Sequence, residues 1–205
     1  MIVIIDYGMG NLGSIHNMLR KIGSDSRISA QISDIESAEK LILPGVGSFD
    51  NAMRNLQNLD LIPILNKKVM QEKTPVLGIC LGIQIFTRGS EEGSFPGLGW
   101  VDAETIRFRF NEPQRNLKIP HMGWNSVEIK KEDALFNNMV QDPRFYFVHS
   151  FHIMCNNPDN ILTTTHYGYD FISSLQKENI YGTQFHPEKS HKYGMKIFKN
   201  FVELS

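Results

Sequence analysis

The stretch Thr74-Pro75-Val76-Leu77-Gly78-Ile79-Cys80-Leu81-Gly82-Ile83-Gln84 reads as a strand, a tight turn and a helix. Val76 to Ile79 is uninterrupted and apolar, which is typical of a strand buried on both faces of a parallel sheet. The Gly-x-Cys-x-Gly sequence that follows matches a nucleophile elbow, with cysteine in the place of serine. This stretch therefore predicts an α/β fold with Cys80 at the carboxyl edge of a sheet.

The same alternation of strand and helix runs through the first half of the chain. Ile2–Ile5 and Leu41–Leu43 are predicted buried strands, and helices are expected at residues 11–22, after Ser48 and at 61–69. Asn11 is a candidate N-cap for the first helix and Gly23 its candidate stop. We expect one domain over residues 1–205, with an open, largely parallel sheet flanked by helices, as in flavodoxin-like folds.

The second half of the chain has shorter, alternating segments, which predict partly antiparallel strands and hence a mixed sheet. A final helix is expected where apolar residues recur at helical spacing. The strands are expected at 101–110, 124–129, 144–151, 161–165, 171–175 and 180–184, and the helix at 192–201.

Composition excludes several classes of protein. The 205 residues carry 21 basic and 22 acidic side chains, so electrostatics do not favour a nucleic-acid binder. Two cysteines, Cys80 and Cys155, do not make a disulfide framework. Neither a signal peptide nor an apolar run of about 20 residues is evident. We expect a soluble, cytoplasmic protein.

Cys80 is a candidate nucleophile. The turn places its sulfur at a helix N-terminus, where the positive end of the helix dipole favours the thiolate. The backbone N–H of Leu81 is then a candidate oxyanion donor. A lone elbow sequence is also compatible with a buried structural cysteine, so a second feature is needed to decide.

His186-Pro187-Glu188 supplies that second feature at the end of a predicted strand. Residues i and i+2 of an extended chain point to the same side, so Glu188 is expected to reach one imidazole nitrogen while the other faces a thiol. Cys80, His186 and Glu188 are therefore a candidate nucleophile, base and orienting carboxylate. Both features end strands, at the sheet edge where α/β proteins bind ligands.

Together these segments resemble the class I (triad-type) glutamine amidotransferases, and among them the glutaminase subunits of imidazole glycerol phosphate synthases. The resemblance covers essentially the whole chain. It rests on the elbow, on the His-Pro-Glu sequence and on residues 6–12 (DYGMGNL), 44–47 (PGVG), 119–125 (IPHMGWN), 146–150 (YFVHS) and 185–190 (FHPEKS).

The resemblance implies hydrolysis of L-glutamine through a Cys80 thioester, with no cofactor. His186 would move the protons and Glu188 would hold its tautomer. The backbone of Gly45, Val46 and Gly47 would help to build the oxyanion hole after a signal from a partner. Substrate contacts would come from Gly47, Gln84, Ser150 and Phe151.

The implied partner is a (β/α)8-barrel cyclase that receives the ammonia in histidine biosynthesis. Met9, Asn11, His121, Trp124 and Lys189 would lie on or near the docking face. Residues 97–105 are more similar to paralogues encoded with surface-polysaccharide genes, which would supply a sugar-modifying amidotransferase. Two further departures, Phe151 for tyrosine and Ile83 for methionine, remove no catalytic group.

Other classes of function are open to the sequence. Gly8-x-Gly10-x-x-Gly13, with Asp34 about 20 residues on, matches a dinucleotide fingerprint but leaves the cysteine elbow unexplained. A cysteine peptidase or γ-glutamyl hydrolase would share the elbow, and a binding module would keep only the fold. His149, His152 and Cys155 are three apart, a spacing that does not converge on one strand face, so no metal site is expected.

Overall fold

The computed structural model describes residues 1–112 and 116–204. The strands are β1 (Ile2–Ile5), β2 (Ser26–Ser29), β3 (Lys40–Gly45), β4 (Val76–Cys80), β5 (Ala103–Arg107), β6 (His121–Ser126), β7 (Glu128–Ile129), β8 (Arg144–His149), β9 (Phe151–Cys155), β10 (Ile161–Tyr167), β11 (Tyr169–Lys177) and β12 (Ile180–Thr183). The helices are α1 (Leu12–Lys21), α2 (Ile32–Glu36), α3 (Phe49–Asn58), α4 (Leu61–Asn66), α5 (Leu81–Gln84) and α6 (His191–Glu203). A π-helical turn (Lys67–Gln71) continues α4, and short 3-10 turns cover Ala134–Phe136, Pro158–Asn160 and Pro187–Lys189.

The main sheet has the order β2-β1-β3-β4-β12-β11-β10-β7, and the strands from β2 to β12 in this order are parallel. β11, β10 and β7 continue it antiparallel, while β5 and β9 pair beside β11. β6 and β8 form a separate two-stranded sheet. The predicted open, mixed and largely parallel sheet is confirmed.

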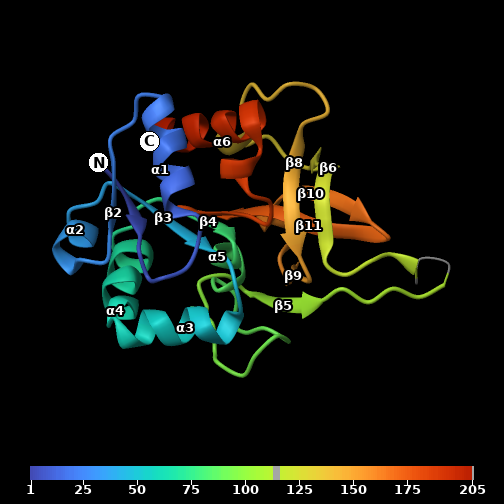
Figure 1. Ribbon diagram of the computed structural model, residues 1–205, viewed down its shortest axis with the longest axis horizontal. Helices are drawn as coiled ribbons and strands as arrows, with labels where there is room; N and C mark the ends of the chain where they lie inside the picture. Colours follow the sequence, from blue (N-terminus) through green and yellow to red (C-terminus); the bar gives the residue numbers. More distant parts are fainter. Residues whose placement is uncertain (113–115, 205) are drawn as a thin grey trace.

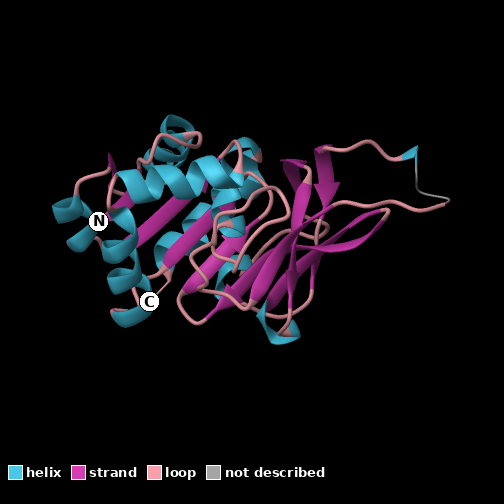
Figure 2. Cartoon of the chain, turned by 90° about the horizontal axis from the view of Figure 1, so that it is seen from below, coloured by secondary structure: helices cyan, strands magenta, loops and turns pink. Residues whose placement is uncertain are grey.

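Helices cover both faces of the parallel half (Figures 1 and 2). Alternate residues of β1 explain this: Val3 and Ile5 enter one core with α2, α3 and α4, whereas Ile2 and Ile4 enter another with α1 and α6. A strand that must fill two apolar layers cannot alternate with polar residues. The continuous apolar run at Ile2–Ile5 follows from that double burial.

Some details of the first half differ from the prediction. β2 and α2 were not predicted, because Ser26-Arg27-Ile28-Ser29 lies at the sheet edge and carries few apolar residues. Asn11 does lie at the N-cap of α1, but its side chain hydrogen-bonds Glu188 rather than the helix. Gly23 follows the end of α1 with φ of 77°, the left-handed conformation expected of a glycine stop.

Where the structure describes the chain, no helix is both long and apolar enough to cross a bilayer.

Candidate active site

Cys80 lies at the turn from β4 into α5, as predicted. Its φ of 55° and ψ of −108° lie outside the regions that side chains normally favour, so the turn is strained. Close packing explains the flanking glycine: a Cβ added at Gly82 would lie 1.8 Å from the carbonyl oxygen of Leu43 on β3. The elbow that follows β4 is therefore packed closely against β3, with Cys80 at the end of the sheet.

His186 and Glu188 form a buried pair. The imidazole Nδ1 lies 2.8 Å from Glu188 Oε1, and both side chains are 1% exposed. Because a carboxylate only accepts, Nδ1 donates and Nε2 is left for the thiol. The expected contact is present, but the reason given for it was wrong. Glu188 lies in the 3-10 turn Pro187–Lys189 rather than on an extended chain.

Asn11 supports this pair from α1. Its Nδ2 donates to the same Glu188 oxygen at 2.9 Å. Two donors on one carboxylate oxygen hold the ring of His186 at a fixed angle. The other oxygen, Oε2, is buried and has no partner among the described residues, and the same holds for His186 Nε2.

Electrostatics couple the three candidate triad residues. Burial disfavours charge on His186, but the Cys80 sulfur and the Glu188 carboxylate outweigh it and raise the imidazole pKa to about 10. Burial likewise raises the pKa of Glu188, yet the hydrogen bonds from His186 and Asn11 leave it lowered. The site therefore favours a protonated His186 beside an ionised Glu188.

A cavity of about 300 Å³ opens over the thiol. It is lined by Val46, Gly47, Cys80, Leu81, Gln84, Glu92, Pro120, Val148, His149, Ser150, Phe151 and His186. This set brings together the elbow, the loop after β3 and the strand end at residues 148–151. Nearly all the predicted oxyanion and substrate residues thus share one cavity.

The predicted oxyanion loop is tightly packed at its two glycines. A Cβ at Gly45 would lie 2.7 Å from that of Leu81, and one at Gly47, where φ is 114°, would lie 2.9 Å from Met9 Cε. Tyr7 donates its hydroxyl to the Pro44 carbonyl at 2.5 Å. The backbone at Gly45 therefore runs beside Leu81, the residue that follows Cys80.

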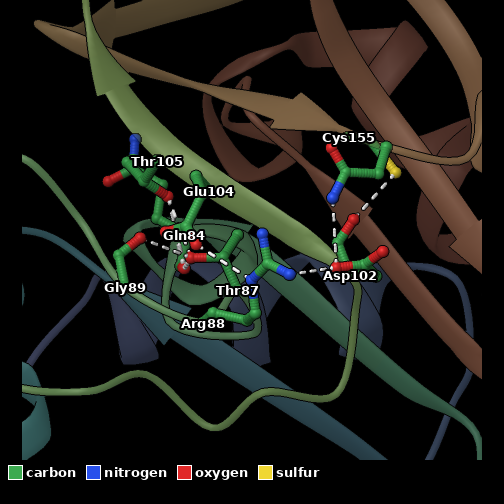
Figure 3. Close-up of polar contacts among 9 residues, drawn as sticks. Gln84, Thr87, Arg88, Gly89, Asp102, Glu104, Thr105 and Cys155 are labelled. Carbon is green, nitrogen blue, oxygen red and sulfur yellow. Dashed lines mark hydrogen bonds and ion pairs between the residues drawn. The ribbon is translucent and has the colours of Figure 1, made fainter.

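Gln84 contributes differently from expectation. Its Nε2 donates to the Phe151 carbonyl at 3.1 Å and to Gln184 Oε1 at 3.0 Å, so both amide hydrogens are used within the protein. Its backbone carbonyl accepts from Thr87 at 2.7 Å and lies 3.4 Å from the Thr105 hydroxyl (Figure 3). Only the amide oxygen of Gln84 remains for a ligand in the cavity.

Three further residues were not predicted for the site. Glu92 lines the cavity and accepts from the Phe49 backbone N–H at 2.8 Å. Gln184 is fully buried and its Nε2 lies 3.8 Å from the Cys80 sulfur. His149 lines the cavity and its Nδ1 lies 2.7 Å from the Phe151 carbonyl. Only the position of Gln184, two residues before His186 at a strand end, could have indicated its role.

The predicted docking residues divide into exposed and buried ones. Trp124 is 46% exposed and stacks on His191 at 5.5 Å, next to Met122, which is 62% exposed. Lys189 is exposed and its Nζ lies 5.6 Å from the ring centroid of Tyr146. Met9 is partly buried against Gly47. His121 is 3% exposed, so its side chain lies beneath this face rather than on it.

The glycine fingerprint of the dinucleotide alternative has another explanation. A Cβ at Gly10 would lie 2.8 Å from that of Pro44, so the glycine permits close packing on the loop after β3. Asp34 accepts hydrogen bonds of 2.6 Å from both Arg27 and Ser29. Both oxygens of the Asp34 carboxylate, the group that a dinucleotide site would use for ribose, are therefore hydrogen-bonded within the protein.

Comparison with known proteins agrees with this geometry. The family Glutamine amidotransferase class-I matches residues 3–204. The chain is 56% identical to "Imidazole glycerol phosphate synthase subunit HisH 2" of Methanococcus maripaludis, over 99% of each chain. It is 46% identical to "Imidazole glycerol phosphate synthase subunit HisH 1" of the same organism, over the full length of both.

Among solved structures, that of PurLQS from Thermotoga maritima superposes with a TM-score of 0.71 at 17% identity, covering 98% of this chain and 96% of the other. At that identity the likeness concerns the fold. With the family match and the relatives at 56% and 46% identity, it follows that this chain belongs to the class I glutamine amidotransferases, among the HisH-type subunits of imidazole glycerol phosphate synthase.

Proposed function

We propose that Cys80, His186 and Glu188 are the catalytic triad with which this chain hydrolyses glutamine to glutamate and ammonia. The observation that carries the proposal is the 2.8 Å bond between His186 and Glu188, in reach of an elbow cysteine that lines the same cavity. This is the arrangement of nucleophile, base and orienting group that covalent catalysis requires.

The mechanism follows from these contacts. His186 takes the thiol proton, and the Cys80 sulfur attacks the side-chain amide carbon of glutamine. The resulting oxyanion is stabilised by the Leu81 N–H at the start of α5 and by a backbone N–H of residues 45–47. The imidazolium then protonates the leaving amine, which departs as ammonia. A water molecule activated by His186 hydrolyses the thioester and releases glutamate.

The cavity suits the amino-acid end of glutamine. The Glu92 carboxylate is opposite in charge to the substrate α-ammonium group, and the Gln84 amide oxygen is a second acceptor. Ser150 and Phe151 line the same cavity, and their backbone groups are proposed to contact the α-carboxylate. Glu92 therefore joins Gly47, Gln84, Ser150 and Phe151 as a proposed substrate residue.

The proposed partner is the cyclase subunit of imidazole glycerol phosphate synthase, a (β/α)8 barrel that consumes the ammonia. Ammonia is mostly protonated in neutral water and loses its nucleophilic lone pair, so direct transfer to a docked enzyme is an advantage. The exposed Met122 and Trp124 are residue types enriched at protein interfaces, and the exposed Lys189 lies on the same face.

A second candidate acceptor is a sugar-modifying amidotransferase. It is favoured by the sequence at residues 97–105, and the presence of two HisH paralogues in a single organism is compatible with a second acceptor. The chemistry at Cys80 would be the same, and only the docked enzyme would differ.

Ammonia release from glutamine tests both parts of this proposal. Cys80→Ser should abolish release by the purified subunit while leaving its thermal unfolding unchanged, and retained activity would refute the triad. Adding a cyclase or a sugar amidotransferase to the wild-type chain should accelerate release with the correct partner only. Equal rates with both enzymes and with neither would exclude activation by docking.

A further inference from the structure

Beyond the triad, one buried side chain contacts the reacting sulfur. Gln184 is fully buried at the end of β12, and its Nε2 lies 3.8 Å from Cys80 Sγ. The sulfur also lies 3.9 Å from the Val148 carbonyl oxygen, to which the Cys80 thiol can donate. A carbonyl can only accept, so Val148 favours the thiol, whereas an amide N–H favours the thiolate.

The orientation of the Gln184 amide is fixed by its neighbours. The Phe151 carbonyl can only accept, so Gln84 must present its NH2 group to it at 3.1 Å. The second hydrogen of that group is donated to Gln184 at 3.0 Å, so Gln184 must present its oxygen to Gln84. Its own NH2 group is then directed to the sulfur.

The Phe151 carbonyl also begins a second chain of hydrogen bonds, which runs through His149 and His121. Phe151 O accepts from His149 Nδ1 at 2.7 Å, which makes His149 Nε2 an acceptor for His121 Nδ1 at 3.0 Å. His121 Nε2 in turn faces Asn125 Nδ2 at 3.3 Å on β6. Burial lowers the pKa of His121 to about 4 and that of His149 well below its usual value, so both rings stay neutral donors and acceptors.

We propose that Gln184 is a further catalytic residue, whose side-chain amide donates a hydrogen bond to the Cys80 sulfur and stabilises the thiolate. Gln84 and His149 act as positioning residues through the Phe151 carbonyl. The inference rests on the proposed function, because it assigns Gln184 a role toward the nucleophile of that same site. It requires no covalent step of its own: the proton that leaves the thiol still goes to His186.

The rate of Cys80 alkylation by iodoacetamide, followed against pH by peptide mass spectrometry on the whole chain, measures the thiolate directly. Gln184→Met keeps the length of the side chain and removes the donor, so the midpoint should rise by about one pH unit. Gln184→Glu is isosteric and places a carboxylate on the sulfur, and it should raise the midpoint further. Other titratable groups near the sulfur are His186, His149, Tyr7, Glu92 and Glu188, and these two substitutions leave all of them in place.

Two controls separate a catalytic role from a structural one. Asn200 is another buried amide, bonded to the Leu135 and Asn137 carbonyls, so Asn200→Leu should lower stability and leave the Cys80 midpoint unchanged. Cys155, bonded to other carbonyls, is an internal reference whose midpoint should not move in any variant.

A midpoint in Gln184→Met and Gln184→Glu equal to that of the wild type would overturn the inference. If one of these two variants fails to fold, the other decides. His149→Phe tests the positioning role of His149, with His152→Phe as its matched control. The pH midpoint of Cys80 alkylation should rise only in His149→Phe. An active glutaminase with unchanged midpoints refutes this inference alone. Glutaminase activity in Cys80→Ser refutes the proposed triad instead.

Discussion

Substitution of Glu188 by glutamine isolates the effect of its charge. The glutamine side chain would fill the same buried space without the charge. In the wild type, Glu188 Oε1 accepts from two donors, His186 Nδ1 at 2.8 Å and Asn11 Nδ2 at 2.9 Å. Hydrogen bonds to a charged group stabilise by about 1.5–3 kcal/mol and neutral ones by about 0.5–1.5 kcal/mol. The imidazolium therefore loses about 1–2 kcal/mol, and the pKa of His186 should fall from about 10 by about one unit.

The effect on catalysis should exceed that electrostatic loss. An amide can turn its NH2 group toward His186 and so select the wrong tautomer, which leaves Nε2 protonated and unable to accept from the thiol. We expect kcat for glutamine hydrolysis to fall by roughly 10²–10⁴, with KM nearly unchanged because Glu188 does not line the cavity.

The assay is ammonia release over a range of glutamine concentrations, with unfolding temperature measured on the same samples. Asn11→Ala is the companion variant: it keeps the carboxylate and removes one donor, so its loss in kcat should be smaller. A kcat for Glu188→Gln within threefold of the wild type would refute the role given to the carboxylate. A change confined to KM would place Glu188 in substrate binding instead.

The remaining predictions concern stability and selectivity of the site. Gly82→Ala should lower the free energy of unfolding by about 3 kcal/mol or more in chemical denaturation, since its Cβ would lie 1.8 Å from the Leu43 carbonyl; a loss under 1 kcal/mol would contradict the packing described. Burial lowers the pKa of His121 to about 4 in the folded chain, so between about pH 4 and 6.5 the imidazole is protonated in the unfolded chain but not in the folded one. The free energy of unfolding should therefore fall as the pH drops through that window. The loss is about 2 kcal/mol after allowance for solvent screening, and His121→Gln should show a flatter dependence when urea midpoints are compared. Glu92→Gln should raise KM for glutamine about tenfold with little change in kcat; an unchanged KM would remove Glu92 from the substrate residues.

The apolar patterns predicted the doubly covered sheet well, because strands such as Ile2–Ile5 must be apolar on both sides. The elbow was also predictable, since a sharp turn at Cys80 needs small neighbours. The polar contacts between residues far apart in the sequence could not be predicted. Asn11 looked like a helix cap, yet its amide contacts a carboxylate 177 positions away. Glu92 gave no local signal, and for Gln184 the sequence offered only its place two residues before His186, because the contacts of both side chains depend on segments that only folding brings together.

The position of β12 has a consequence for how the enzyme is made. This strand lies in the middle of the sheet, between β4 and β11, although it comes late in the chain. Its pairing with β4, Thr183 beside Ile79, is what brings His186 to Cys80. A nascent chain that has emerged only as far as β11 carries a complete thiol turn with no base beside it. With His186 and Glu188 in their proposed roles, we expect no glutamine hydrolysis until synthesis has passed residue 188, so an unfinished subunit should release no ammonia.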